Sequence, residues 1–236
     1  MSEDTKTARI IAARQALRER FLARPDRARP ARGSGEANRH GEPKLPPGQT
    51  VTEKWPVLDL GKHPMIDKTS VRLVVEGAVA ERLALTWSDL LTLPHVEETS
   101  DFHCVTGWSQ MDLQFTGVRL RELLSRADPR AEARYLLCHA ADGYTTSLSL
   151  DDALSPDVLL AHRVNGAPLP PEHGGPLRMI TPRLYAWKGA KWIEKLELLT
   201  EEKLGFWEAG GYAKVGDPWT EDRYRDPDDP PPGAEI

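Results

Sequence analysis

The chain has few cysteines and no long hydrophobic run. Its 236 residues include two cysteines, Cys104 and Cys138, too few for a disulfide framework in a domain of this size. No segment approaches the roughly 18 apolar residues that span a bilayer, and the start, Met1-Ser-Glu-Asp-Thr, lacks the basic and apolar regions of a secretion signal. We therefore expect a cytoplasmic, thiol-reduced protein that does not insert into membranes.

An excess of positive charge and the common cofactor signatures are also missing. A net charge of -5 argues against nucleic acid as a partner. The chain contains no Gly-x-x-x-x-Gly-Lys or Gly-x-Gly-x-x-Gly pattern, so neither a P-loop nor a dinucleotide-binding fold is predicted. Cys-x-x-Cys and His-x-x-x-His pairs are absent, which leaves no ligand spacing typical of zinc.

Composition divides the chain into three parts. Residues 1–50 are predicted to form a basic helix over 5–24 and then a flexible linker rich in proline, glycine, arginine and alanine. Because this helix carries charges of both signs, we expect it to pack on its own domain or on a partner subunit rather than to bind a membrane surface. Residues 51–216 are predicted to be the folded body, and residues 217–236 an acidic, proline-rich tail. The apolar stripe of the helix consists of Ile10, Ile11, Leu17, Phe21 and Leu22.

Strand and helix signals in the folded body follow no regular βαβ alternation, which predicts a mixed α+β fold. A short helix is expected after Thr86, with Asp89 completing the cap and Pro94 ending it. Another helix is expected over 118–127. Strands are predicted over 70–77, 134–139, 144–150, 158–164, 177–180 and 192–199, and residues 56–61 form a short strand or an extended arm.

The segment from Asp101 to Ser109 places Cys104 after an apolar stretch and just before the turn Gly107-Trp108. A thiolate is both a nucleophile and a soft metal ligand, while a free cysteine is as often a small buried hydrophobe. Cys138 lies within an apolar strand, which favours a core position. A cysteine-dependent hydrolase would need His103, His139 or His173 as base. On a strand, however, His103 would point to the face opposite Cys104.

A second stretch, residues 173–192, combines cations with glycines. Backbone N–H groups without bulky side chains, together with guanidinium and ammonium groups, are what phosphate binding requires. A solvated basic loop is the alternative interpretation. The cations are His173, Arg178, Lys188 and Lys191, and the glycines are Gly174, Gly175 and Gly189.

Together the two stretches resemble the molybdopterin-binding domain of the sulfite oxidase family. The run Cys104-Val-Thr-Gly-Trp-Ser is similar to the loop in which that family's cysteine ligates molybdenum. The runs His173-Gly-Gly-Pro-Leu-Arg178 and Lys188-Gly-Ala-Lys191-Trp192 are similar to its pterin-phosphate loop.

The resemblance implies a mainly β core, a molybdenum–molybdopterin cofactor and a catalytic domain over 51–216. Cys104 would be the metal ligand and catalytic residue. The implied cofactor-binding residues are His173, Arg178, Lys188, Gly189, Ala190 and Lys191, with further contacts from Leu58 and Asp59 and from Asp142 or His139.

The sequence also departs from the sulfite-oxidising members of the family. Their Arg-Asn-His run is replaced by Leu58-Asp59-Leu60, and the arginines after their cysteine by Gly107-Trp108-Ser109. The cysteine loop is closer to the methionine sulfoxide reductase branch, which is exported with a twin-arginine signal that this sequence lacks.

The resemblance implies two-electron oxygen-atom transfer on a small substrate with a separate electron-transfer partner. A cysteine-dependent hydrolase and a non-catalytic anion- or pterin-binding module remain alternatives. Tyr144 and Tyr185 could each serve as a hydrogen-bond donor to an oxo group or as a core tyrosine.

Overall fold

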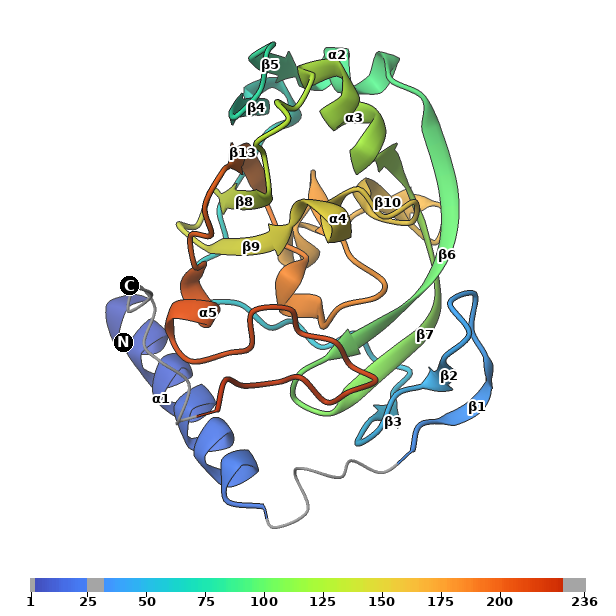
Figure 1. Ribbon diagram of the computed structural model, residues 1–236, viewed down its shortest axis with the longest axis vertical. Coiled ribbons are helices and arrows are strands. Elements are labelled where there is room, and N and C mark those ends of the chain that lie inside the picture. Colours follow the sequence, from blue (N-terminus) through green and yellow to red (C-terminus); the bar gives the residue numbers. More distant parts are fainter. Residues whose placement is uncertain (1–2, 25–31, 227–236) are drawn as a thin grey trace.

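The computed structural model describes residues 3–24 and 32–226 (Figure 1). Two larger sheets and one two-stranded sheet make up most of this part of the chain, which confirms the mixed α+β fold with a mainly β core. The helices are α1 (Glu3–Leu22), α2 (Trp87–Thr92), α3 (Leu120–Ala127), α4 (Leu150–Ala153) and α5 (Phe206–Ala209), and the 3-10 turns are η1 (Lys68–Ser70), η2 (Pro171–His173) and η3 (Ala186–Lys188). The strands are β1 (Ser34–Ala37), β2 (Pro43–Leu45), β3 (Thr50–Val51), β4 (Arg72–Gly77), β5 (Leu83–Thr86), β6 (His95–Cys104), β7 (Trp108–Arg119), β8 (Tyr135–Ala140), β9 (Thr145–Ser149), β10 (Leu159–Val164), β11 (Ala167–Pro168), β12 (Arg178–Ile180) and β13 (Ile193–Leu199).

The six-stranded sheet is built around the long hairpin of β6 and β7. Strand β7 pairs with β6, β10 and β3, while β11 and β12 pair with β10. The hairpin runs antiparallel from the His95–Val118 pair to the Cys104–Trp108 pair, with a register shift between Ser100 and Phe102. In Figure 1 the two strands curve together along one side of the molecule. Because β6 ends at Cys104, the hairpin turn holds this thiol at the end of a rigid sheet.

The five-stranded sheet has the order β5-β4-β13-β8-β9. Strands β4 and β13 run parallel, while the other pairs, including the hairpin of β8 and β9, are antiparallel. Leucines of α3 pack on this sheet in the largest core cluster. Cys138 lies in the same cluster with no exposed surface, as expected for a core cysteine.

Several local signals acted as predicted. Thr86 and Asp89 form a reciprocal capping box at the start of α2, and Asp128 at φ 51° ends α3. The segment 56–61 forms no strand. Of the two structures expected for this segment, the extended arm is the one that forms, and it lines the cavity described below.

Helix α1 packs on the rest of the chain rather than standing apart from it. The Thr7 hydroxyl donates to the Leu60 carbonyl at 2.7 Å, and Arg18 Nε donates to the Gly211 carbonyl at 3.2 Å. Phe21 meets the Tyr224 ring edge-on at 5.4 Å. Over the described ranges, none of the helices combines the length and apolar character needed to cross a bilayer.

The packed structure extends beyond both expected boundaries of the folded body. Residues up to 50 were expected to be linker, yet β1, β2, the start of β3 and the buried Gln49 lie before that boundary. Residues 217–226 were expected to be tail. There, the Trp219 indole donates to the Pro43 carbonyl at 2.7 Å, and Arg223 and Tyr224 are buried. Proline-rich composition misled the prediction because these prolines alternate with aromatic and charged side chains that find partners far away in the sequence. The remaining linker residues 25–31 and tail residues 227–236 lie outside the described part.

Candidate active site

The turn after β6 is fixed by contacts from two segments that lie far from it in the sequence. Gly107 adopts φ 96°, a conformation that favours glycine, and its carbonyl accepts the Thr50 N–H at 3.0 Å. Gln49 Nε2 donates to the Cys104 carbonyl at 3.2 Å, and Arg223 donates to the Val105 carbonyl. The Cys104 thiol is therefore held in a defined position, 3.2 Å from the Thr106 hydroxyl.

His103 and Cys104 lie on opposite faces of β6, as strand alternation predicts. His103 Nδ1 is 2.8 Å from the Ser109 hydroxyl, and its ring meets Trp219 edge-on. Burial lowers the pKa of His103 to about 4. Cys104, by contrast, lines a cavity, where burial raises the pKa of its thiol. His103 therefore does not serve as a base for this thiol.

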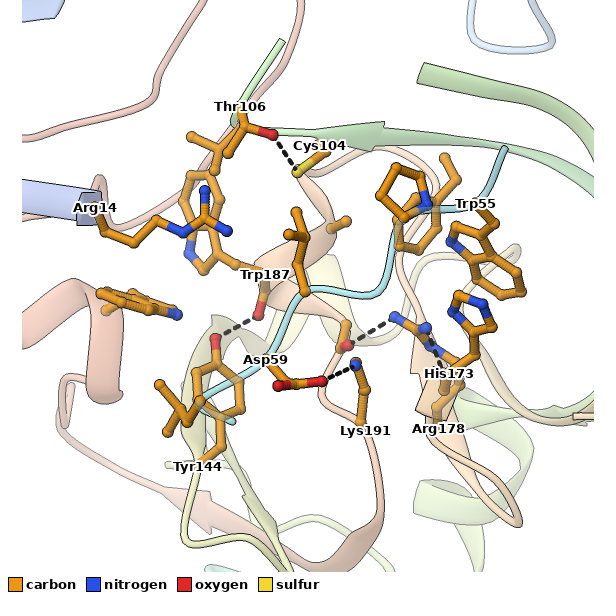
Figure 2. Close-up of a pocket in the computed structure, with 18 of the residues that line it drawn as sticks. Arg14, Trp55, Asp59, Cys104, Thr106, Tyr144, His173, Arg178, Trp187 and Lys191 are labelled. Atoms are coloured by element: carbon orange, nitrogen blue, oxygen red, sulfur yellow. Dashed lines mark hydrogen bonds and ion pairs between the residues drawn. The ribbon is translucent and has the colours of Figure 1, made fainter. Parts of the chain in front are cut away.

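The cavity is walled by segments from across the chain, including the arm at 55–60 and helix α1. Figure 2 shows Cys104 between Arg14 on one side and the group of Trp55, His173 and Arg178 on the other. The lining residues are Arg14, Trp55, Pro56, Leu58, Asp59, Leu60, Phe102, Cys104, Val105, Thr106, Trp108, Asp142, Tyr144, His173, Arg178, Ala186, Trp187, Gly189, Lys191, Trp192, Trp207 and Tyr212.

One end of the cavity is strongly cationic. Arg178 is buried, and within the described ranges its guanidinium donates only to backbone, to the His173 carbonyl at 2.8 Å and the Gly189 carbonyl at 3.2 Å. Its Nε finds no partner among the described residues. Burial lowers the pKa of Arg178 to about 9. A buried guanidinium without a carboxylate partner is costly, so this end of the cavity suits an anion.

Two further groups share this end. Burial, and then the nearby Arg178, lowers the pKa of Lys191 to about 8, although Asp59 at 3.3 Å acts in the opposite direction. His173 stacks on Trp55 with ring centroids 4.0 Å apart, and burial followed by Arg178 and Lys191 lowers its pKa to about 4. A bound anion would relieve the electrostatic repulsion that the cations Arg178 and Lys191 impose on each other and on His173.

Glycines let the backbone approach these cations closely. At Gly174, which has φ 103°, a Cβ would lie 2.9 Å from the Lys191 Cβ and 3.0 Å from the Arg178 Cβ. At Gly189, a Cβ would lie 2.5 Å from the Met179 carbonyl oxygen. A side chain at either position would therefore displace the residues that form the cationic end.

Residues 60–207 match the family described as the oxidoreductase molybdopterin binding domain, which is more than half of the chain. The chain belongs to the molybdopterin oxidoreductases of the sulfite oxidase family. It is an oxidoreductase, and its cofactor is molybdenum–molybdopterin.

Relatives of known sequence and structure agree with this assignment. The uncharacterized oxidoreductase YuiH of Bacillus subtilis is 44% identical over 182 residues, covering 77% of this chain and 92% of YuiH. The protein-methionine-sulfoxide reductase catalytic subunit MsrP of Campylobacter jejuni is 29% identical over 162 residues, 61% of this chain and 54% of MsrP. The crystal structure of the sulfane dehydrogenase SoxCD from Paracoccus pantotrophus matches with a TM-score of 0.56 and 25% identity, covering 60% of this chain and 41% of that one. The chain thus spans nearly all of YuiH but only about half of MsrP.

The donor set in the cavity of this molybdopterin oxidoreductase fits its cofactor. Among residues 3–24 and 32–226, no three His, Cys, Asp or Glu side chains gather as a metal site. A single cavity-lining thiol, Cys104, therefore suits a metal whose other ligands come from an organic group. The orphaned Nε of Arg178 and the cation Lys191 suit the anionic part of such a group.

Most of the residues expected from the sequence do meet in the cavity, but three do not line it. Its lining includes Leu58, Asp59, Cys104, Asp142, His173, Arg178, Gly189 and Lys191. Lys188 points into the interior, where its ammonium lies 2.7 Å from the Glu208 carboxylate and 2.6 Å from the Ser147 carbonyl. His139 Nε2 lies 2.7 Å from the carboxylate of Glu197 on the neighbouring strand β13. Ala190 is buried and does not line the cavity.

The side chains of Lys188 and His139 fail to reach the cavity for local geometric reasons. On strand β8 successive side chains alternate, so the core position of Cys138 turns His139 to the other face. Lys188 ends the short turn η3, which directs its side chain toward α5 and Glu208.

Sequence reasoning missed the aromatic wall and one cation. Trp55, Trp187, Trp207 and Tyr212 line the cavity from three separate segments, and no local pattern joins these segments. Arg14 had one readable signal, because it fills the gap in the apolar stripe of α1 between Ile11 and Leu17. Tyr144 lines the cavity but donates its hydroxyl to the Trp187 carbonyl at 2.6 Å, while Tyr185 is fully buried and absent from the lining.

Proposed function

We propose that this oxidoreductase catalyses two-electron oxygen-atom transfer on a small substrate, with Cys104 as the protein ligand to molybdenum. The observation that carries the proposal is that the Cys104 thiol lines the same cavity as Arg178, whose buried Nε has no hydrogen-bond partner among the described residues. Both cysteines are buried, but Cys138 belongs to the apolar core and does not line the cavity. This contrast leaves Cys104 as the thiol suited to ligate a metal there.

In this proposal the cationic end binds the phosphate of the cofactor. Arg178 is already oriented by two backbone carbonyls, and Lys191 by the Glu172 carbonyl at 2.8 Å. Because these side chains are fixed before the cofactor arrives, little conformational entropy is lost on binding. Asp59 holds the other side of the Lys191 ammonium and is itself ordered by the Gly61 N–H at 2.7 Å.

The bound cofactor supplies the metal that exchanges an oxygen atom and two electrons with the substrate. The role of the chain is to orient the cofactor and to exclude water around it. Trp187 and Tyr212 are buried within the aromatic cluster that also contains Cys104. Trp187 is fixed by ring contacts with Tyr185 and Tyr212 at 5.4 and 5.1 Å. Such a wall lowers the local dielectric and strengthens the electrostatic interactions at the reacting centre.

A cysteine-dependent hydrolase receives less support from the same geometry. An attacking thiol needs a base within hydrogen-bond reach and a depressed pKa. The hydrogen-bonding side chain beside Cys104 is the Thr106 hydroxyl, and burial raises the pKa of the thiol. His103 faces away, His139 is engaged with Glu197, and His173 stacks on Trp55.

A separate protein is proposed to exchange electrons with this chain. MsrP carries the name of a catalytic subunit, which supports a partner subunit for that relative. Among the described residues of this chain, no group of three or more His, Cys, Asp or Glu side chains is placed to hold a further metal ion. The cytoplasmic location expected from the sequence stays a prediction.

The test is turnover of the purified holoprotein with reduced methyl viologen and a small sulfoxide, alongside molybdenum and pterin analysis. We expect near-stoichiometric molybdenum and sulfoxide-dependent viologen oxidation in the parent and in Cys138→Ala. Cys104→Ser should lose the activity by a factor of about a thousand or more, because a first-sphere ligand is changed. Full molybdenum loading without turnover of any oxygen-atom donor or acceptor would favour a non-catalytic binding module. Turnover that Cys104→Ser leaves unchanged would refute the role of this thiol.

A further inference from the structure

Arg14 occupies an unusual place on helix α1. The side of the helix that faces the body carries half-buried residues at helical spacing, and the central position of that side is a cation instead of an apolar residue. Thr7 and Arg18 fasten α1 to backbone on either side of it. The half-buried residues are Thr7, Ile10, Ile11, Arg14, Leu17, Arg18, Phe21 and Leu22.

The Arg14 guanidinium has no counter-ion within residues 3–24 and 32–226. It lines the cavity together with Cys104, and no hydrogen bond or ion pair joins it to the part of the chain that the structure describes. Figure 2 shows its side chain extending from α1 into the cavity toward the indole of Trp187. A half-buried cation facing a cavity without such a partner is available to an anionic ligand.

This cation is distinct from the cationic end assigned to the cofactor. In Figure 2, Arg14 lies on one side of Cys104, while Arg178 and His173 lie on the other. Arg178 and Lys191 both donate to carbonyls of η2, those of His173 and Glu172, whereas Arg14 enters the cavity from α1. With the phosphate of the cofactor at Arg178 and the metal at Cys104, an anion at Arg14 belongs to the substrate side.

We propose that Arg14 is a substrate-contacting residue that binds the negative group of a small organic anion while the reacting atom lies near Cys104. This proposal rests on the proposed oxygen-atom transfer and names its substrate class. A single arginine suits a monoanion, and the neighbouring Trp187, Trp207 and Tyr212 form a wall for the apolar part of such a molecule. The loop after the cysteine, Gly107-Trp108-Ser109, carries no cation, so helix α1 supplies the charge instead.

The kinetic test compares two substrates that differ only in charge: methylsulfinylacetate and methylsulfinylacetamide. With the holoprotein, each sulfoxide is reduced to the sulfide, and its oxygen leaves as water with two protons and two electrons from two reduced methyl viologen molecules. We expect Arg14→Gln to lower kcat/KM for the carboxylate about tenfold, since one charge-assisted contact is lost, and to change the amide less than about twofold. Arg14→Lys should keep most of the preference because it keeps the charge.

Arg20→Gln is the matched control, because Arg20 is exposed on the same helix and donates to the Ala16 carbonyl within it. It removes the same net charge and should leave the preference unchanged. Detachment of α1 in Arg14→Gln would affect both substrates alike, so the carboxylate-to-amide ratio separates a contact from a structural effect. A ratio unchanged in Arg14→Gln, with molybdenum content intact, would overturn the proposal and leave the proposed function standing. Loss of cofactor from Arg14→Gln would overturn it as well, by assigning Arg14 to the cofactor.

A second readout needs neither cofactor nor turnover. Full-length protein from cells grown without molybdate is alkylated with iodoacetate or iodoacetamide, and modification of Cys104 is followed by peptide mass spectrometry. Cys138, which has no exposed surface, serves as the internal unreactive thiol. The iodoacetate-to-iodoacetamide rate ratio should fall several-fold in Arg14→Gln and stay constant in Arg20→Gln, because a cation near the thiol attracts the anionic reagent. If neither sulfoxide is reduced, the proposed oxygen-atom transfer from sulfoxides fails, whereas a ratio that falls in Arg14→Gln still supports an anion site beside the Cys104 thiol, and an unchanged ratio overturns it.

Discussion

Lys188 and Lys191 are three residues apart, yet their ammonium groups lie in different surroundings. Lys188 pairs with Glu208 inside the protein, where both side chains are at most 1% exposed. Thr146 donates to the same carboxylate oxygen at 2.7 Å, so Glu208 lies in a buried polar cluster. Lys191 lines the cavity beside Arg178 and Asp59. The sequence motif assigns both lysines to the cofactor, whereas the contacts give Lys188 a structural role.

Exchanging each lysine for methionine separates the two roles. We expect Lys188→Met to lower the free energy of unfolding by about 3–5 kcal/mol, because it leaves the Glu208 carboxylate buried without its cation. Lys191→Met should cost less stability but reduce the molybdenum and pterin retained after dialysis about tenfold, through loss of a charge-assisted contact. Urea unfolding and elemental analysis of both variants check this. Equal cofactor loss with unchanged stability in Lys188→Met would contradict the assignment.

At the residue scale, sequence reasoning found what is local. Cys104, His173 and the cations Arg178 and Lys191 stand in recognisable runs, and all of them line the cavity. Arg14 and Trp55 reach the same cavity from segments about 90 and 49 positions before Cys104, which no spacing within a motif can reveal.

At the scale of elements, the turn between η2 and β12 shapes the cationic end. Gly174 combines a positive φ of 103° with close packing against the side chains of Lys191 and Arg178. Gly143, in the turn between β8 and β9, has a similar φ of 86°, but a Cβ added there would meet nothing within 4 Å. The two glycines therefore separate the effect of backbone strain from the effect of crowding.

Gly174→Ala should destabilise the protein by about 2–4 kcal/mol, since both strain and overpacking act, and should weaken cofactor retention. Gly143→Ala, the matched control, should cost about 1–2 kcal/mol from strain alone and leave the cofactor in place. Thermal unfolding and molybdenum analysis of both variants provide the measurement. Identical losses in the two variants would show that the contacts of Gly174 with the two cations are unimportant.

Secondary structure was predictable where one element carries its own signal. The capping box of Thr86 and Asp89 formed as expected, and the strands predicted over 134–139 and 144–150 are β8 and β9. The place of the arm at 56–61 was predicted through the family resemblance and not from its own residues, because its extended backbone pairs with no sheet and is held by α1 along the cavity.

At the scale of the whole molecule, the two ends of the described chain meet the same site. Helix α1 contributes Arg14 to the cavity wall, and Arg223 near the other end holds the Val105 carbonyl in the cysteine turn. In Figure 1, α1 lies beside the C-terminal part of the described chain. Composition marked both regions as appendages because low hydrophobicity says nothing about long-range polar contacts. Residues outside the predicted domain of 51–216 therefore also help to build the site.

Global stability should also depend on a histidine remote from the cavity. Burial, followed by His95, Arg163 and Lys68, lowers the pKa of His162 to about 4, against an ordinary value of 6.5. Between about pH 6.5 and 4, the unfolded chain therefore binds a proton that the folded chain does not. The free energy of unfolding keeps its full value above pH 6.5 and decreases as the pH is lowered from 6.5 to 4.

His162→Gln should remove part of this acid sensitivity. Because the ring is half-buried, we discount for solvent and expect a difference of about 1–2 kcal/mol between pH 7 and pH 4.5 that the variant lacks. Urea unfolding at a series of pH values gives the slope. A parent and a variant with parallel pH profiles would contradict the effect. His63→Gln, which changes an exposed histidine, is the control.

The central claim is that the Cys104 sulfur binds molybdenum, and X-ray absorption at the molybdenum edge tests it most directly. The holoprotein, Cys104→Ser and Cys138→Ala would be compared at equal molybdenum content. The account predicts one sulfur neighbour fewer around the metal in Cys104→Ser and an unchanged spectrum in Cys138→Ala. The same number of sulfur neighbours in all three proteins would contradict it.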